Sequence, residues 1–214
     1  MRGNTMRVVL PVACLLFSAA TFAKGPLPST NEELAAYLPD GAMVETRIDA
    51  DFNGDGMKDI AIISANDDVR VLTAFLAYAD EYNTGFEPIG TGALDVGPLG
   101  AASLRMQKNV LVLEDLTGGT SATSSTYRFR FDAAESKMRL IGLDAEYYSR
   151  TYQHGSRKLS FNYLTGDRVE QVSEVGTKDD EALVPGPEKR SKGKPRKIWL
   201  DDIPSPEALL LDEK

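Results

Sequence analysis

Residues 51–63 read DFNGDGMKDIAII, and the organisation of the chain can be worked out from this stretch. Oxygen-bearing side chains recur at its positions 1, 3, 5 and 9, as Asp51, Asn53, Asp55 and Asp59. A tight loop whose alternate side chains point inward can surround a hard cation, and Ca²⁺ prefers oxygen ligands. The backbone carbonyl at position 7 adds another oxygen. The spacing therefore predicts a calcium loop over residues 51–59, with the ligands Asp51, Asn53, Asp55, Met57 and Asp59.

The residues around the turn indicate what the loop connects. Gly56 stands where the chain must reverse, and glycine adopts positive φ at low cost because it has no Cβ. The run Ile60–Ile63 is short, apolar and rich in β-branched residues, which favours a buried strand. An EF-hand would need a bidentate Glu at position 12, where Ile62 stands, and a helix after the loop. We therefore expect a strand on each side, the first over residues 43–48.

With that strand before it, the stretch resembles the calcium loop between two strands of FG-GAP and VCBS-type repeats, found in integrin-like β-propellers. The resemblance covers about residues 43–65 and implies the ligands Asp51, Asn53, Asp55 and Asp59. The rest of the chain resembles, more loosely, small secreted bacterial proteins with one such loop, an FRFD…LIGLD segment (129–144) and an NYLTG hairpin (162–166). The alternative is a solvated turn without an ion, because Asp, Asn and Gly are ordinary turn residues.

The remaining pattern predicts a mainly β protein with antiparallel sheets, in a sandwich or a partial propeller-like arrangement. One short helix is expected over residues 29–38, where Thr30 and Glu33 form a capping signature and Pro39 ends it. Further strands are expected at 59–65, 69–79, 86–89, 103–106, 110–114, 125–131, 138–143, 158–163 and 168–175. Residues 69–79 also allow a helix, but a strand is favoured because the neighbouring strands need a partner.

Three segments divide the chain. Residues 1–23 have two arginines, an apolar core and small residues at the cleavage position, which is typical of a secretory signal peptide. Residues 24–177 form the β domain, and residues 178–214 a charged tail containing Pro and Gly, expected as an extended arm whose Ile198 and Trp199 dock on the sheet. The only cysteine, Cys14, lies in the signal peptide. We expect an exported protein, periplasmic or secreted, with no transmembrane segment after cleavage.

Charge narrows the possible partners. Removal of residues 1–23 changes the net charge from −8 to −10, which disfavours general nucleic-acid binding. A basic run in the tail could contact an anionic surface or the protein's own acids; it consists of Lys189, Arg190, Lys192, Lys194, Arg196 and Lys197. The partner is otherwise an unknown protein or glycan. Five tyrosines of the second half could line a groove for such a ligand, although cross-strand pairing also explains them.

No sequence motif defines a reaction. His154 is the only histidine and is expected in an exposed hairpin turn, and residues 118–124 are expected to form a long flexible connection. The favoured function is a non-enzymatic calcium-binding module of the cell envelope, with a structural or ligand-binding role. One alternative is an interaction protein acting through the basic tail. The other is an envelope-polymer hydrolase that uses carboxylates at strand ends, namely Glu114, Asp115, Asp144 and Glu146.

Overall fold

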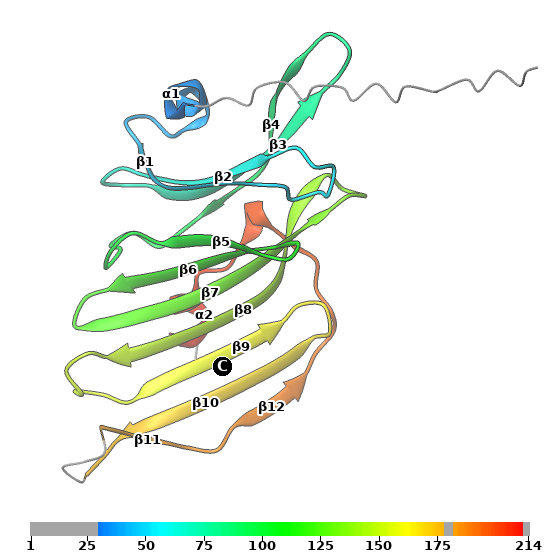
Figure 1. The fold of residues 1–214 in the computed structure, drawn as a ribbon. Coiled ribbons are helices and arrows are strands. Elements are labelled where there is room, and N and C mark those ends of the chain that lie inside the picture. The colour runs from blue at the N-terminus through cyan, green and yellow to red at the C-terminus, as the bar shows by residue number, and fades with distance from the viewer. Residues whose placement is uncertain (1–29, 178–181, 212–214) are drawn as a thin grey trace, which may run out of the picture.

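A computed structural model describes residues 30–177 and 182–211, so the expected signal peptide lies outside the described residues. The chain forms two antiparallel sheets, one above the other in Figure 1. The smaller sheet has the strand order β1-β2-β3-β4. Its strands are β1 (Met43–Ala50), β2 (Asp59–Ala65), β3 (Arg70–Ala79) and β4 (Thr84–Ala93). Residues 70–79 are therefore a strand, as predicted.

The larger sheet follows the order β5-β6-β7-β8-β9-β10-β11, a succession of hairpins from its first strand to its sixth. Its strands are β5 (Ser103–Gln107), β6 (Val110–Gly118), β7 (Ser121–Asp132), β8 (Lys137–Ser149), β9 (Ser156–Asn162), β10 (Asp167–Val175) and β11 (Leu183–Pro185). Two short strands attach beside this path: β12 (Lys189–Lys192) pairs with β10, and β13 (Ile198–Trp199) pairs with β8. The prediction of a mainly β fold with antiparallel, sandwich-like sheets is confirmed.

The small sheet is covered on both faces, which explains the apolar run Ile60–Ile63 in its strand β2. Ile60 and Ile62 of β2 pack against Leu34 of the short helix α1 (Asn31–Leu34), which continues as the 3-10 turn η1 (Ala35–Tyr37). Ala61 and Ile63 point the other way, into the core shared with the large sheet. Side chains alternate between the faces of a strand, so a strand buried on both faces needs a continuous apolar run.

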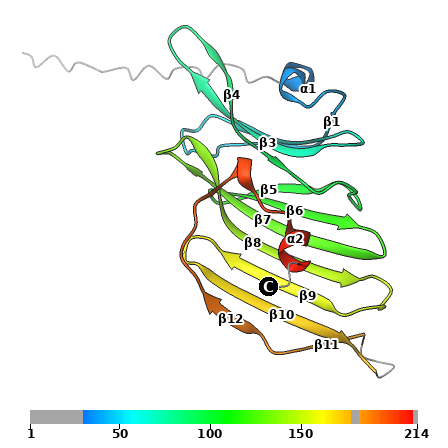
Figure 2. The same ribbon diagram turned by 180° about the vertical axis from the view of Figure 1, so that it is seen from behind.

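The large sheet has one apolar and one polar face, as the alternation of residues in its strands predicts. Tyr127 and Phe129 of β7 are buried in the shared core, whereas Arg130, the residue after Phe129, is exposed. The 3-10 turn η2 (Leu200–Asp202) and helix α2 (Pro206–Leu211) lie on the apolar face, which Figure 2 presents. Leu210 of α2 packs there against Leu159 of β9.

The expected long connection over residues 118–124 is wrong. Strand β6 runs to Gly118 and β7 begins at Ser121, so a tight hairpin replaces the flexible segment. Gly118 has φ of +108°, and a Cβ there would lie 2.5 Å from the Ser121 carbonyl oxygen. The glycine in this stretch permits a sharp reversal, and the serines and threonines beyond it pair across the hairpin.

The charged tail is extended but does not form a separate arm. Lys189–Lys192 make strand β12 at the edge of the large sheet, with every residue exposed. Ile198, opposite Leu140 in the register of β13 with β8, is 7% exposed, and Trp199 is half-buried. The segment then continues through η2 into α2. Among the described residues, no helix has both the length and the apolar character needed to span a bilayer.

A buried arginine joins the two sheets. Arg70, at the start of β3, is 2% exposed. Its Nε donates to Glu45 Oε2 of β1 at 2.7 Å, and its Nη1 donates to Asp115 Oδ2 of β6 at 2.7 Å. The remaining guanidinium nitrogen, Nη2, donates to Glu45 Oε1 at 2.8 Å and to Asp115 Oδ1 at 3.0 Å. Hydrogen bonding to Arg70 lowers the pKa of Glu45.

Replacing Arg70 by methionine is expected to destabilise the protein by about 3–5 kcal/mol, because it leaves two carboxylates without their cation inside the fold. Urea unfolding followed by circular dichroism measures this change. The matched control is Arg105→Met, which breaks an exposed pair with Glu114 whose side chains are 46% accessible. That change should cost less than about 1 kcal/mol. Equal losses in the two variants would contradict a special role for the buried pair.

Candidate functional site

The predicted calcium loop lies between β1 and β2, so it does join two strands of one sheet. Gly56 has φ of +82°, which confirms the positive φ expected there, and Gly54 has φ of +84°. A residue with a Cβ is strained in this region, so both glycines serve the turn. Phe52, between the first two predicted ligands, is 4% exposed and anchors the loop in the shared core.

The carboxylates of the loop accept hydrogen bonds from its own backbone. Asp51 Oδ1 accepts from the N–H of Gly54 at 2.6 Å, and Asp51 Oδ2 accepts from Gly56 at 2.7 Å. Asp55 Oδ1 accepts from the N–H of Met57 at 2.6 Å. Asn53 Oδ1 accepts from the N–H of Asp55, and its Nδ2 donates to Asp55 Oδ2 at 3.0 Å. These hydrogen bonds from polar side chains shape the turn.

Asp59 connects this loop to the next strand. It is fully buried; its Oδ2 accepts from the N–H of Phe52 at 2.6 Å and its Oδ1 from the N–H of Ala77 in β3 at 2.9 Å. Burial raises the pKa of Asp59, these two hydrogen bonds oppose the rise, and the nearby carboxylates of Asp55 and Asp51 add to it. A positive ion beside the loop would relieve that repulsion.

The donor set fits Ca²⁺ in kind, because every predicted ligand offers oxygen and a carboxylate oxygen that accepts one N–H keeps a second lone pair. Within residues 30–177 and 182–211, no group of three or more acidic, histidine or cysteine side chains converges as a metal site. The structure thus places Asp51, Asn53, Asp55, Met57 and Asp59 on one loop but does not gather them around a common point. Calcium binding by these five residues stays a prediction.

The carboxylates of the hydrolase alternative are distributed over both faces of the large sheet. Asp115 points inward to Arg70, whereas its neighbour Glu114 pairs with Arg105 outside. Asp144 and Glu146 line a hollow of 310 Å³ on the polar face, two residues apart on β8. They therefore lie side by side instead of facing one another across a cleft.

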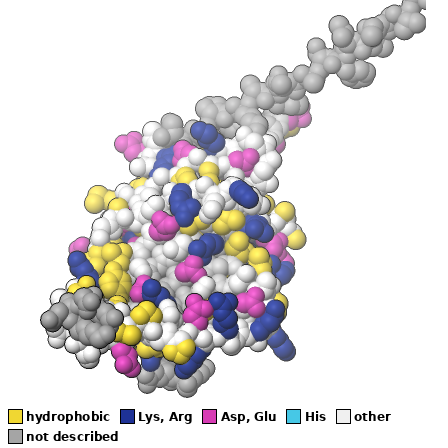
Figure 3. Space-filling view, turned by 60° about the horizontal axis from the view of Figure 1, so that its bottom comes forward, with side chains coloured by type: hydrophobic (Ala, Val, Ile, Leu, Met, Phe, Trp, Pro, Cys, Tyr) yellow, Lys and Arg dark blue, Asp and Glu magenta, His cyan; other side chains and the backbone are white. Residues whose placement is uncertain are grey.

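Each of these two acids also has a cation partner. Asp144 lies 2.7 Å from Arg128 and accepts from Ser160 Oγ, and Glu146 lies 3.5 Å from Lys158. Both signs of charge are interspersed over the side of the molecule that Figure 3 presents. Glycoside hydrolysis uses two carboxyl groups on either side of the scissile bond, whereas these two lie on one strand and point the same way. The arrangement is that of a solvated sheet face.

His154 is more enclosed than the sequence predicts. Its ring stacks on Tyr147 with centroids 5.1 Å apart, and its Nδ1 lies 2.7 Å from the Gly155 carbonyl oxygen. Because a carbonyl only accepts, Nδ1 carries the proton in the neutral ring, and Nε2 accepts from Ser121 Oγ at 2.7 Å. This pair joins the β6–β7 and β8–β9 turns. The sequence does not predict this contact, because it depends on the pairing of β7 with β8, which sets Ser121 opposite Ser149.

The tyrosines considered for a ligand groove do not share one surface. Tyr127 and Tyr163 are each 2% exposed, and Tyr147 and Tyr148 are consecutive in β8 and so point to opposite faces. Tyr152 is 55% exposed in the β8–β9 turn. The large sheet therefore uses most of these rings for packing.

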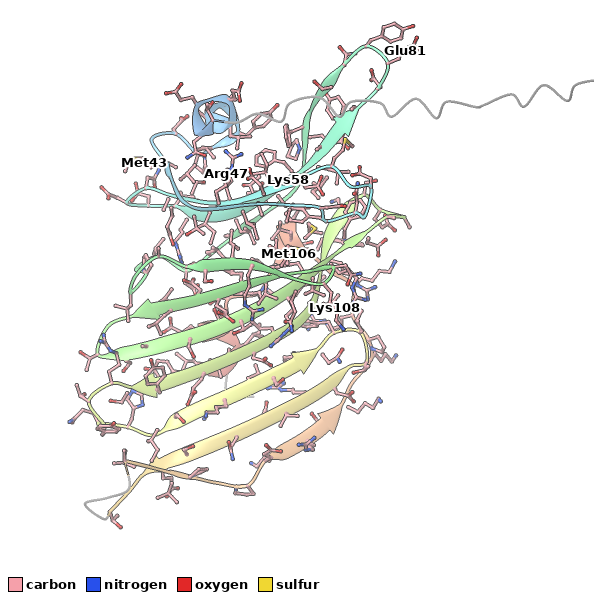
Figure 4. The ribbon with its side chains drawn as sticks, in the orientation of Figure 1. Met43, Arg47, Lys58, Glu81, Met106 and Lys108 are labelled. Carbon is pink, nitrogen blue, oxygen red and sulfur yellow. The ribbon has the colours of Figure 1, made fainter. Side chains whose placement is uncertain are left out.

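The β3–β4 hairpin projects from the small sheet, with Glu81 at its tip in Figure 4.

No protein-family model, curated protein or solved structure matches this chain.

The raised pKa of Asp59 predicts how stability depends on pH. The folded state holds the Asp59 proton more tightly than the unfolded state, so this group contributes stability below its unfolded pKa of about 3.9 and loses it as pH rises through the folded pKa. In chelator, the unfolding free energy of the parent relative to Asp59→Asn should therefore increase as pH falls from neutral. Urea titrations of both proteins across pH measure this difference, and an opposite slope would contradict the assignment.

Proposed function

We propose that this chain is an exported, non-enzymatic β module of the cell envelope whose β1–β2 loop binds Ca²⁺, and that the module has a structural or ligand-binding role. The observation that carries the proposal is the 51–59 loop, with an oxygen at each expected position and left-handed glycines at Gly54 and Gly56. Asp51, Asn53, Asp55 and Asp59 with the carbonyl of Met57 would hold the ion. Ca²⁺ supplies positive charge among carboxylates that otherwise repel one another.

The chain's own contacts explain why such an ion would matter beyond the loop. Asp59 links the loop to the N–H of Ala77, and Phe52 reaches from the same loop into the core between the sheets. Neutralising the loop carboxylates would therefore strengthen the junction of β1, β2 and β3. The ion's role in this proposal is structural, and the binding surface lies elsewhere.

Titration of Ca²⁺ into the purified, metal-stripped protein is the first test. Extracellular calcium modules bind with Kd of about 10⁻⁴–10⁻³ M, so about 10 mM Ca²⁺ should stabilise the fold by about 1.4–2.7 kcal/mol. For a domain of this size the melting temperature should rise by roughly 3–10 °C. Thermal unfolding by circular dichroism measures the shift, and isothermal titration calorimetry measures the binding.

The variant for this test is the double change Asp51→Asn and Asp55→Asn, which keeps one side-chain oxygen at each turn position but removes two charges. It should lose the calcium-dependent shift. Asp80→Asn is the matched control, because Asp80 Oδ1 accepts from the N–H groups of Tyr82 and Asn83 in a similar turn of another hairpin. It should keep the shift. A parent protein that does not respond to Ca²⁺ would reduce the loop to a turn.

A further inference from the structure

Two hollows adjoin on the large sheet, and α2 borders the first of them. Figure 2 shows α2 in front of this sheet. The first, of 800 Å³, lies between Leu209 and Leu210 of α2 and the strands β9 and β10. The second, of 390 Å³, lies between Phe161, Tyr163 and the chain from Ser191 to Arg196. Arg168 lines both. We call the two together the basic groove, defined by the cations Arg157, Arg168, Lys189, Lys194 and Arg196.

The basic groove concentrates positive charge on a protein whose net charge is −8. Glu170 is the single carboxylate among its lining residues, and it pairs with Arg168. Two further lysines border these hollows but pair with acids on the polar face, Lys158 with Glu146 and Lys192 with Asp167. A concave surface on which one sign of charge predominates focuses its field and attracts ligands of the opposite sign.

Aromatic rings hold two of the arginines in place. Phe161 and Tyr163 stack with ring centroids 5.2 Å apart. The guanidinium carbon of Arg168 lies 5.1 Å from the Phe161 centroid, and that of Arg196 lies 6.0 Å from the Tyr163 centroid. Burial raises the pKa of Tyr163 and both guanidiniums oppose the rise, so both positive groups lie near this ring. Guanidiniums fixed on ring faces lose little side-chain entropy when they bind an anion.

The cations form a row instead of a single cluster. One face of β9 carries Arg157 and, four residues on, Phe161. Tyr163 follows two residues later, just past the end of the strand. With about 3.3 Å per residue, Arg157 lies about 13 Å from the level of Arg168 and about 20 Å from that of Arg196. Arg157 is itself held by α2, since its Nη1 donates to the Leu210 carbonyl oxygen at 3.0 Å. A row of this length matches a chain of repeated anionic groups.

We propose that the basic groove binds a linear acidic polysaccharide, whose carboxylates meet the row of arginines. The apolar wall of Leu159, Leu209 and Val172, the last 51% exposed, suits the C–H faces of sugar rings. An anionic membrane would meet the exposed Lys189, Lys194 and Arg196 as well, and vesicle binding distinguishes that ligand from a polysaccharide. This inference names a ligand for the binding role proposed above, and it does not depend on the calcium loop.

Calorimetric titration of the purified protein with polygalacturonate, a uniform polyuronate, tests this proposal. We expect binding that weakens with ionic strength and no binding of neutral dextran. The triple variant Arg168→Gln, Lys189→Gln, Lys194→Gln should bind at least about tenfold more weakly. The matched control is the triple variant Lys58→Gln, Arg105→Gln, Lys108→Gln, which removes the same charge from other elements. Figure 4 labels Lys58 and Lys108. The affinity of this control for polygalacturonate should lie within about twofold of that of the parent.

Equal losses in the two triple variants would overturn the groove, because only total charge would then matter. Binding of phosphatidylglycerol vesicles or single-stranded DNA without binding of polygalacturonate would also overturn the assignment. Thermal unfolding verifies that each variant is folded. The Asp51→Asn, Asp55→Asn variant should keep polygalacturonate binding when folded, so failure of the groove and failure of the calcium loop give separate results.

Discussion

The fold depends on the ion bridge in which Arg70 holds Glu45 and Asp115. These residues come from β3, β1 and β6, so one guanidinium ties the small sheet internally and then to the large sheet. A charge removed from water must have all its donors satisfied, which this geometry achieves with two bidentate contacts and the Asp95 carbonyl. Only one placement of the sheets keeps these contacts, whereas the apolar side chains around them tolerate small shifts.

Local patterns predict the strands well because each sheet has a distinct burial. Alternation in residues 127–131 indicates a strand with one solvated face, and the continuous apolar run after Asp59 indicates a strand covered on both. Residues 118–124 were mispredicted because glycine, serine and threonine suit a slack loop and a tight hairpin equally. In the tail, the docking of Ile198 and Trp199 on the sheet is predicted correctly because these two residues are apolar. Strand β12 escaped prediction because its polar residues do not reveal that it pairs with β10.

The candidate site could be located from sequence, but the behaviour of its side chains could not. Spacing identifies residues 51–59 and the turn at Gly56, since both are local properties. That Asp59 is buried and accepts from Ala77 depends on the pairing of β2 with β3. Arg70 carries no sequence signal beyond a charge at the start of an apolar strand. The basic groove likewise requires the register that sets Arg168 beside Phe161 and brings the tail alongside.

Strand β12 closes the outer edge of the large sheet with the sequence Lys-Arg-Ser-Lys, fully exposed. An open edge presents unpaired N–H and C=O groups to which another copy of the chain can add. Lysine and arginine side chains along that edge would bring like charges together if two copies aligned in an antiparallel manner. The positive charges of Lys189, Arg190 and Lys192 would therefore oppose edge-to-edge association of two large sheets, which favours colloidal stability.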